Sequence, residues 1–239
     1  MPTSIVHSGK CLQLPCDRCI GKHYNVCHLL ENDRQRELYH TGVRQRWGKR
    51  DFLFRADNPV GPVLKVTSGI VAASRTLSDG RRQIIAFYLP GDICDHFEGD
   101  GSYAFDGQAI TPVETCSFNR ERFTAFVGRN PDVADEMRSD LASRLKLVGK
   151  HLSVVGQLTS TERVANFIAT ITGSYASRHM PTQPLPLPMK RSDIADYLGL
   201  RLETVSRAFS KLRKRNIIEL RDDEVVIVDQ SRLLELSNT

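Results

Sequence analysis

The chain has 239 residues, 40% of them hydrophobic and 26% charged, with a formal net charge of +5. This length allows one or two domains with a proper core, and the apolar content is ordinary for a globular protein. No apolar run approaches a membrane span and the N-terminus has no hydrophobic signal region, so we expect a cytoplasmic protein without a membrane partner. Thiols stay reduced in the cytoplasm, where clustered cysteines indicate metal or redox chemistry rather than disulfides.

Residues 1–30 form an arm in which four cysteines crowd one short polar stretch. Cys16 and Cys19 make a C-x2-C pair, Cys27 follows after seven further residues, and Cys11 lies just before them. A tight loop between the cysteines can turn their thiolates toward one centre, and such soft ligands select zinc, copper(I) or iron–sulfur clusters. The spacing leaves three alternatives open: a zinc knuckle completed by Cys11 or a nearby histidine, an iron–sulfur cluster, and unliganded or redox-active thiols.

The pattern of an antiparallel barrel or sandwich begins at Lys49, after a short helix and a connection expected over residues 31–48. Its segments are short, rich in Val, Ile, Phe and Thr, and separated by turns that contain Gly, Asp or Pro. Ser78-Asp79-Gly80 predicts a hairpin turn in which Gly80 supplies a positive φ. Pro90-Gly91-Asp92 predicts a second turn.

A small barrel can also hold a ligand, so a metal-dependent barrel enzyme is an alternative. Such an enzyme needs a paired His-x-His and further ligands on neighbouring strands. The strand region contains His96 as its single histidine. We therefore expect a protein that is not an enzyme.

A long helix is predicted over residues 130–158. Asn130 is expected to cap it and Pro131 to occupy its first helical position. Apolar residues from Val133 to Leu158 then recur at steps of four and three over about four heptads. A stripe this narrow suits a helix that pairs with its own copy in a homodimer, although a core helix of one domain is the alternative.

The C-terminal residues predict a helix, a loop, and then a helix-turn-helix. Thr159 to Glu162 forms a capping box for the first helix, and the prolines of residues 173–189 indicate a loop with a short extended stretch. Ser192 is expected to cap a short second helix, and Gly199 to make the turn into a third.

The third helix, over residues 200–215, has the pattern of a recognition helix. Val205, Phe209 and Leu212 share one face, while the other faces carry basic and hydroxyl side chains. Taken alone, this could be a solvated amphipathic helix. The glycine turn before it and an alternating hairpin at Asp222-Asp223 after it, a wing, predict a DNA-binding domain.

Three residues of this helix are expected to read bases. Arg207 can make a bidentate contact to guanine, Glu203 can accept from cytosine N4, and Ser206 can contact a base or a thymine methyl group. The other residues predicted to bind DNA, mainly through phosphates, are Lys190, Arg191, Ser192, Arg201, Thr204, Lys211 and Lys214.

This order of segments resembles the Crp–Fnr family of bacterial transcription regulators over nearly the whole chain. Residues 203–207, read as ETVSR, match the E-x-x-S-R motif of the Fnr and FixK branch, and the cysteine spacing is similar to its alphaproteobacterial Fnr and AadR-like members. The resemblance implies an α+β fold with an N-terminal double-stranded β-helix, which is a jelly-roll-like β-roll. The implied domains are a cysteine-bearing arm (1–30), a β-roll sensor domain (31–129), a dimerisation helix (130–158) and a winged helix-turn-helix DNA-binding domain (159–239).

The resemblance also implies a cofactor and its ligands. Cys116 stands where the family places its fourth ligand, so Cys16, Cys19, Cys27 and Cys116 are expected to hold a [4Fe-4S] cluster. Cys11 and Cys94 fall outside the matching positions. The implied function is an oxygen-responsive regulator, mainly an activator of anaerobic or microaerobic genes, that binds a TTGAT-type palindrome as a homodimer. A family member whose cysteines bind zinc or act as redox thiols is the alternative.

Two expectations about partners follow from the same resemblance. The cyclic-nucleotide branch holds the phosphate with an arginine, and residues 96–110 contain none, so we expect no cyclic nucleotide. The turn of Asp79, Gly80, Arg81 and Arg82 matches a surface that family members use against RNA polymerase. A plain solvated hairpin is the alternative for that turn.

Overall fold

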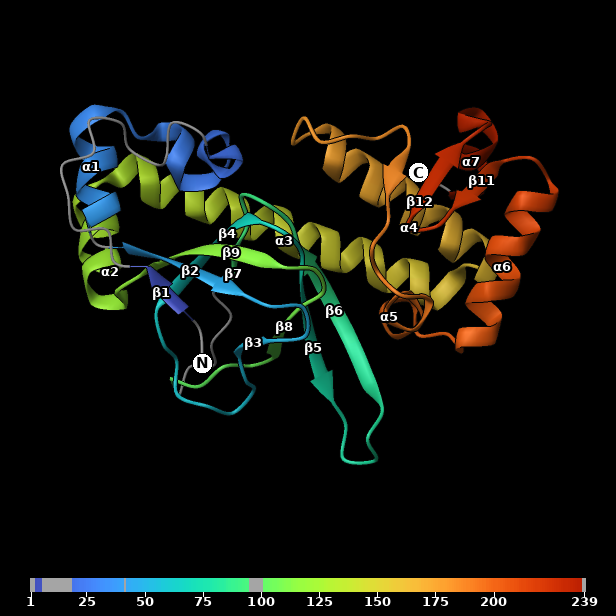
Figure 1. Cartoon of the computed structure of the whole chain (residues 1–239), viewed down its shortest axis with the longest axis horizontal. Helices are drawn as coiled ribbons and strands as arrows, with labels where there is room; N and C mark the ends of the chain where they lie inside the picture. Colours follow the sequence, from blue (N-terminus) through green and yellow to red (C-terminus); the bar gives the residue numbers. More distant parts are fainter. Residues whose placement is uncertain (1–2, 6–18, 41, 95–100, 238–239) are drawn as a thin grey trace. The chain divides into compact units, whose positions relative to one another are not determined.

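A computed structural model of the chain describes residues 3–5, 19–40, 42–94 and 101–237. The chain divides into two compact units, Met1–Ser143 and Arg144–Thr239. The first unit combines strands with a helical cover, and the second is mainly helical (Figure 1). Among the helices described, none combines the length and the apolar character needed to cross a lipid bilayer.

The first unit is a sandwich of two antiparallel sheets, which confirms the predicted β-roll. Its sheets have the strand orders β1-β2-β9-β4-β7 and β3-β8-β5-β6. Inward-facing residues such as Leu64, Val71 and Tyr88 form the core between them. The strands are β1 (Thr3–Ile5), β2 (Gly42–Trp47), β3 (Phe52–Phe54), β4 (Val63–Ser68), β5 (Val71–Thr76), β6 (Arg82–Tyr88), β7 (Ile93–Cys94), β8 (Asp106–Ala109) and β9 (Val113–Phe118).

The stretch before Lys49 differs from the expected helix and connection. The helix is present as α1 (Asn32–His40), but the residues after it form strand β2, which pairs with β9 along its whole length. The sequence of β2, GVRQRW, is largely polar because its side chains occupy exposed and half-buried positions. Such a strand lacks the apolar run by which strands are usually predicted.

Both predicted turns are present. Gly80 has a φ of +85° at the tip of the β5–β6 hairpin, where the Leu77 N–H donates to the Arg81 carbonyl over 2.8 Å. Gly91 has a φ of +101° between β6 and β7. A Cβ atom added at Gly91 would lie 2.7 Å from the Cβ of Tyr24, so the N-terminal segment packs directly on this turn.

Helices cover the outer face of the β1-β2-β9-β4-β7 sheet. They are η2 (Ile20–His23), η3 (Asn25–Leu29), α1, α2 (Arg120–Arg129), which was not predicted, and the start of α3 (Pro131–Gln157). Val26 and Leu38 pack there against Phe118 of β9 and Val133 of α3, in a second core. An ion pair of 2.7 Å between Arg34 and Asp132 also ties α1 to α3.

The long helix α3 begins at Pro131, as predicted, and Asn130 stands at its N-cap position, where its carbonyl accepts the Ala134 N–H over 3.1 Å. The side-chain amide of Asn130 donates to the Phe126 carbonyl over 2.8 Å, so the same residue also ends α2. Along α3, Leu141, Leu145 and Leu152 are 65%, 71% and 73% exposed. The predicted apolar stripe is therefore open to solvent in the single chain.

The second unit has the predicted helices and wing. Glu162 accepts the Thr159 N–H over 2.8 Å, which confirms the capping box. Ser192 is not the cap of the short helix, because that helix starts at Arg191 and its N-cap is Lys190. The Lys190 N–H donates to the Asp193 carboxylate over 3.0 Å. The elements are α4 (Ser160–Ala176), β10 (Leu185–Pro186), α5 (Arg191–Leu198), α6 (Leu202–Lys214), β11 (Ile218–Arg221), β12 (Glu224–Ile227) and α7 (Gln230–Ser237), of which α7 was not predicted.

Replacing Gly91 by alanine is expected to destabilise the first unit by about 3 kcal/mol, because backbone strain adds to the clash with Tyr24. Gly80→Ala is the matched control, since that glycine has a similar φ but nothing within 4 Å of an added Cβ. Gly80→Ala should lower the free energy of unfolding by about 1 kcal/mol, because backbone strain is its single expected cost. Urea unfolding followed by the fluorescence of Trp47 measures both losses, and equal losses would contradict the packing of Tyr24 on the turn.

Candidate functional site

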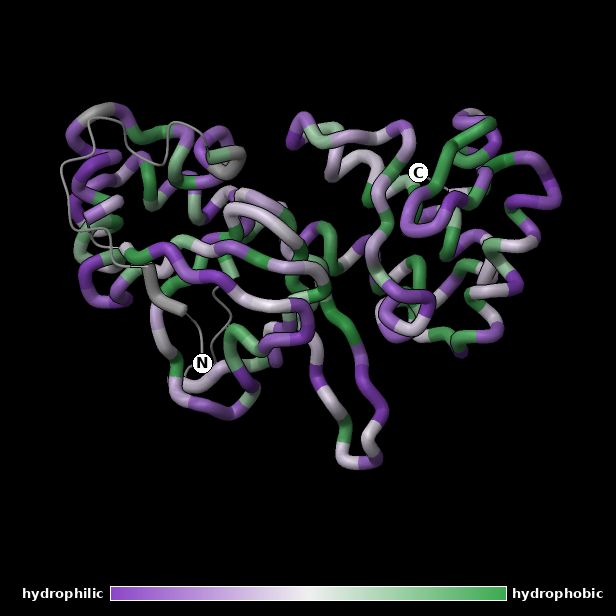
Figure 2. Tube along the Cα trace, viewed as in Figure 1, coloured by the Kyte–Doolittle hydropathy of each residue, from purple (hydrophilic) through white to green (hydrophobic). Residues whose placement is uncertain are grey.

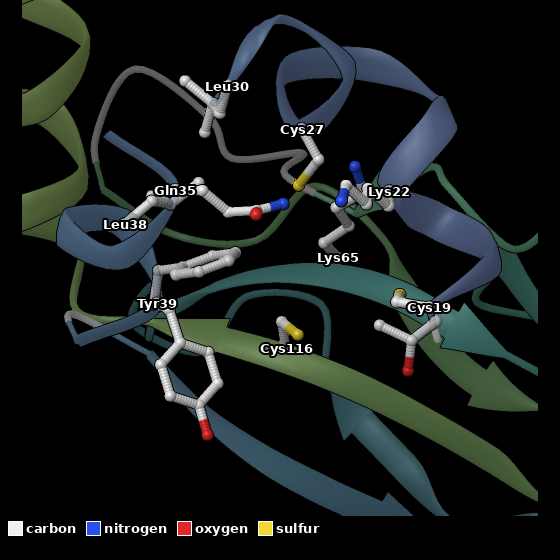
Figure 3. Close-up of a pocket in the computed structure, with 11 residues that line it drawn as sticks. Cys19, Lys22, Cys27, Leu30, Gln35, Leu38, Tyr39, Lys65 and Cys116 are labelled. Atoms are coloured by element: carbon white, nitrogen blue, oxygen red, sulfur yellow. The ribbon is translucent and has the colours of Figure 1, made fainter. Parts of the chain in front are cut away.

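Three of the four predicted ligand cysteines line one pocket of the first unit (Figure 3). Cys19 directly precedes η2, Cys27 lies in η3, and Cys116 lies in β9. The pocket holds about 420 Å³ of empty space, including the part open to solvent. Cys16 and Cys11 lie outside the described residues. The fold therefore brings cysteines that are distant in sequence to a common site.

Strand alternation explains why β9 can serve both the sandwich and this pocket. Side chains two residues apart in a strand share a face. Cys116 and Phe118 thus face the helical cover, whereas Val113 packs inside the sandwich. In β4, Lys65 and Thr67 face the pocket in the same way.

Buried polar side chains line the pocket beside the thiols. Lys65, Gln35 and Thr67 are 2%, 7% and 5% exposed. The Lys65 ammonium donates to the Tyr24 carbonyl over 2.6 Å, while Gln35 Nε2 and Thr67 Oγ1 have no hydrogen-bond partner within the described part of the chain. A buried unsatisfied polar atom costs about 1–3 kcal/mol. No sequence pattern singles out these residues, because one lysine within a strand usually lies in solvent.

The described thiols do not by themselves form a site for a single metal ion. Across the described residues, no three His, Cys, Asp or Glu side chains lie close enough together to hold one metal ion. Cys19, Cys27, Cys94 and Cys116 are not in disulfides. Cys94 is buried in the sandwich core and does not line the pocket.

Helix α6 presents a second candidate site. Val205, Phe209 and Leu212 are buried, as the pattern predicts. The remaining faces expose most of the predicted DNA-binding side chains. These exposed residues are Arg201, Glu203, Ser206, Arg207, Lys211 and Lys214, whereas Arg191, Ser192 and Thr204 are half-buried.

Arg191 has a packing role that the sequence did not indicate. Its guanidinium carbon lies 3.4 Å from the centroid of the Phe209 ring, a cation–π contact between α5 and α6. Burial lowers the pKa of Arg191 from its ordinary value. Arg191 thus holds the two helices together, and part of its guanidinium is shielded from solvent.

The turn between α5 and α6 is supported from α3. Gly199 makes the turn with a φ of +62°, as predicted. The His151 ring stacks on Tyr197 with centroids 4.1 Å apart, and its Nε2 lies 3.0 Å from the Tyr197 carbonyl oxygen. A carbonyl only accepts hydrogen bonds, so Nε2 carries the proton. Burial lowers the pKa of His151, and it raises the pKa of Tyr197 to about 12.

The β5–β6 hairpin projects from the first unit, with Asp79, Gly80 and Arg81 exposed at its end (Figure 1). The Asp79 carboxylate accepts from the backbone N–H and from Nε of Arg81, over 3.0 and 2.8 Å. The side-chain hydrogen bond from Arg81 is the main cause that lowers the pKa of Asp79. Arg82 is half-buried, and its Nη1 donates to the Gln108 side-chain oxygen over 3.4 Å.

Two protein families match parts of the chain. Residues 44–130 match the cyclic nucleotide-binding domain, and residues 162–236 match the Crp-like helix-turn-helix domain. The first range covers the sandwich from β2 onward together with α2. The second range covers the helix-turn-helix with its flanking helices and wing.

Named proteins are similar over almost the whole length. The chain is 32% identical over 233 residues to the transcriptional activatory protein AadR of Rhodopseudomonas palustris, covering 97% of each. It is 30% identical over 222 residues to the nitrogen fixation regulation protein FixK of Bradyrhizobium diazoefficiens, covering 93% of each. The structure of FixK2 from Bradyrhizobium japonicum matches with a TM-score of 0.74 and 33% identity, covering 82% of this chain and 96% of that one.

The His151 imidazole is expected to titrate below 6.5, its ordinary value, because burial disfavours the charged ring. Near that pH the folded state binds fewer protons than the unfolded state, so the second unit should lose stability as the pH falls from 6.5 toward the folded pKa. NMR titration of the ring protons, assigned with His151→Phe, measures this pKa. A midpoint at or above 6.5 would contradict the buried neutral ring.

Proposed function

This chain belongs to the Crp–Fnr family of bacterial transcription regulators, and we propose that it is an oxygen-responsive activator of anaerobic or microaerobic genes. It is a DNA-binding regulator of this family and not an enzyme. The observation that carries the oxygen-responsive part is the shared pocket of Cys19, Cys27 and Cys116. A thiol cluster assembled from distant segments can couple a chemical signal to the fold.

The donor set suits an iron–sulfur cluster. Cys16, which precedes Cys19 in the C-x2-C pair, would complete a ligand set of four thiolates. Zinc-bound sulfurs lie about 3.8 Å apart around one ion, and among the described residues no three potential ligands converge to a single-ion site. Held by these residues, a [4Fe-4S] cluster would supply an oxygen-labile group.

The contacts of the N-terminal segment suggest how the thiol site acts on the rest of the chain. Cys27 and Cys116 border the core in which Leu38 meets Val133, and Arg34 pairs with Asp132 at the start of α3. Thiolates held at one centre would fix this segment on β9 and support α3. A few kcal/mol of differential stability is enough for such a population shift.

The apolar stripe of α3 would carry the change to the oligomeric state. Leu141, Leu145 and Leu152 are exposed and would be covered by the same helix of a second copy. A twofold homodimer would present two copies of α6 about one helical turn apart, which matches a palindromic site. Loss of the thiol-bound group would favour monomers and weaken DNA binding.

The exposed face of α6 suits a TTGAT-type half-site. Arg207 would donate two hydrogen bonds to guanine, Glu203 would accept from cytosine N4, and Ser206 would contact a neighbouring base. Lys211 and Lys214 would meet phosphates. The Thr204 hydroxyl, 3.4 Å from Arg207 Nη2, would help to orient the guanidinium.

We propose that the sandwich binds no cyclic nucleotide, although its fold matches that domain family. Arg75 is the arginine of β5, and its guanidinium already donates to the Ala104 carbonyl over 2.6 Å and pairs with Asp57. The described residues 101–110 contain no arginine to hold a buried phosphate. The turn of Asp79, Gly80, Arg81 and Arg82 at the end of the β5–β6 hairpin would serve as a contact for RNA polymerase.

Arg207→Ala should weaken binding to the palindromic operator by about 1–3 kcal/mol and relax the choice of base at one position. Lys214→Ala is the matched control, because losing a phosphate contact should weaken all sequences alike and reduce the salt dependence. Fluorescence anisotropy with the operator and single-base variants, at several salt concentrations, measures both effects. A base preference retained by Arg207→Ala would refute the assignment.

Protein purified without air should be brown, contain iron and sulfide in about equal amounts, and bind the operator as a dimer. Exposure to air should bleach it and weaken dimerisation and DNA binding together. Cys116→Ser should lose the iron, whereas Cys94→Ala should retain it because Cys94 lies in the sandwich core. Equal operator binding by aerobic and anaerobic protein would refute the oxygen response. A colourless protein that contains zinc would favour the alternative regulator.

A further inference from the structure

The thiol pocket contains polar atoms that its three described cysteines do not explain. Gln35 Nε2 and Thr67 Oγ1 are buried at the pocket wall without a hydrogen-bond partner in the described part of the chain. They come from different elements, α1 and β4, so one local distortion does not account for both. Buried polar groups are nearly always paired, so two orphans at one pocket indicate a missing partner.

Lys65 adds a buried positive charge to the same wall. Its ammonium has three N–H donors, and within the described residues the Tyr24 carbonyl is the one acceptor it meets. Among the described residues that line the pocket, none is an aspartate or a glutamate. A buried charge without an opposite charge is strongly unfavourable, so this pocket is suited to something negative.

The strand register places positive charges on both sides of Cys116. Lys65 of β4 and Arg44 of β2 are its direct partners in the two neighbouring strands. Directly opposed residues point to the same face, with Cβ atoms about 4.5–5.5 Å apart. Figure 3 shows Lys65 beside the cysteines and the amide nitrogen of Gln35 directed toward the sulfur of Cys27.

Helix α1 has an unusual composition for a helix that covers a core. Figure 2 shows it as almost entirely hydrophilic, and Leu38 and Gln35 are its buried residues among those described. A helix that served only to cover the sheet would bury a wider apolar stripe. A polar residue at one of its two buried positions fits a helix that covers a polar group.

We propose that Lys65, Gln35 and Thr67 form a layer of hydrogen-bond donors to the sulfur atoms of the bound cluster, with Lys65 as its fixed counter-charge. This inference rests on the proposed function, because a [4Fe-4S] core in its 2+ state with four thiolates carries a net charge of about −2. The three residues are positioning residues and not ligands. Donors and cations near a cluster stabilise its electron-rich state, so this layer slows the loss of the cluster to oxygen.

Lys65→Met tests the charge, because methionine keeps most of the side-chain volume. The anaerobically reconstituted variant should take up iron and sulfide, have a lower midpoint reduction potential, and bleach in air about tenfold faster than the wild type. A tenfold change in a one-electron equilibrium corresponds to about 59 mV. Lys49→Met is the matched control, since Lys49 is exposed outside the pocket, and it should behave as the wild type.

A purely structural role for Lys65 predicts a different result. In that case Lys65→Met would lower the urea midpoint of the metal-free chain, whereas a counter-charge should leave that midpoint equal or higher. Thr67→Val, which removes a hydroxyl at constant shape, should also keep the metal-free midpoint and speed bleaching two- to threefold. If Lys65→Met does not fold, the bleaching rate of Thr67→Val decides whether the donor layer protects the cluster.

The outcomes separate the two proposals. If the wild type takes up iron and sulfide but Lys65→Met and Thr67→Val bleach at the wild-type rate with unchanged potential, the donor layer is refuted and the proposed function stands. If the wild type takes up neither iron nor sulfide, both are refuted. Faster bleaching in both variants supports the donor layer when the metal-free urea midpoint is equal or higher for Lys65→Met and unchanged for Thr67→Val.

Discussion

The pairing of β9 between β2 and β4 is the constraint on which the first unit depends. Its alternating side chains place Val113 in the sandwich core and Cys116 and Phe118 under the helical cover. A slip of one residue would exchange the two faces, removing the thiol from its pocket and putting a polar residue in its place. The same register aligns Lys65 with Cys116, so the pairing of the strands also determines which side chains line the pocket.

The helix-turn-helix could be predicted because its signals are local. Gly199 and the spacing of Val205 and Phe209 depend on residues within two turns of helix, and the structure agrees with them. Strand β2 could not be predicted, because a largely polar strand is recognisable only by its neighbours. The polar wall of the pocket was missed for the same reason, because Gln35 and Lys65 are brought to one pocket by tertiary structure that no sequence period records.

The two proposed sites differ in how their polar groups are satisfied. At the α5–α6 turn, His151 stacks on Tyr197 and Arg191 lies over the Phe209 ring, so these contacts hold the helix that carries the proposed base-reading residues. The thiol pocket joins segments of very different sequence position, and Gln35 and Thr67 there lack a hydrogen-bond partner within the described residues.

Tyr24 lies between Cys19 and Cys27 and is held on both sides. Its Cβ rests against Gly91, where no side chain would fit, and its carbonyl accepts from Lys65. Tyr24 therefore anchors the described cysteine segment to the β6–β7 turn at a point between the part that carries Cys19 and the part that carries Cys27.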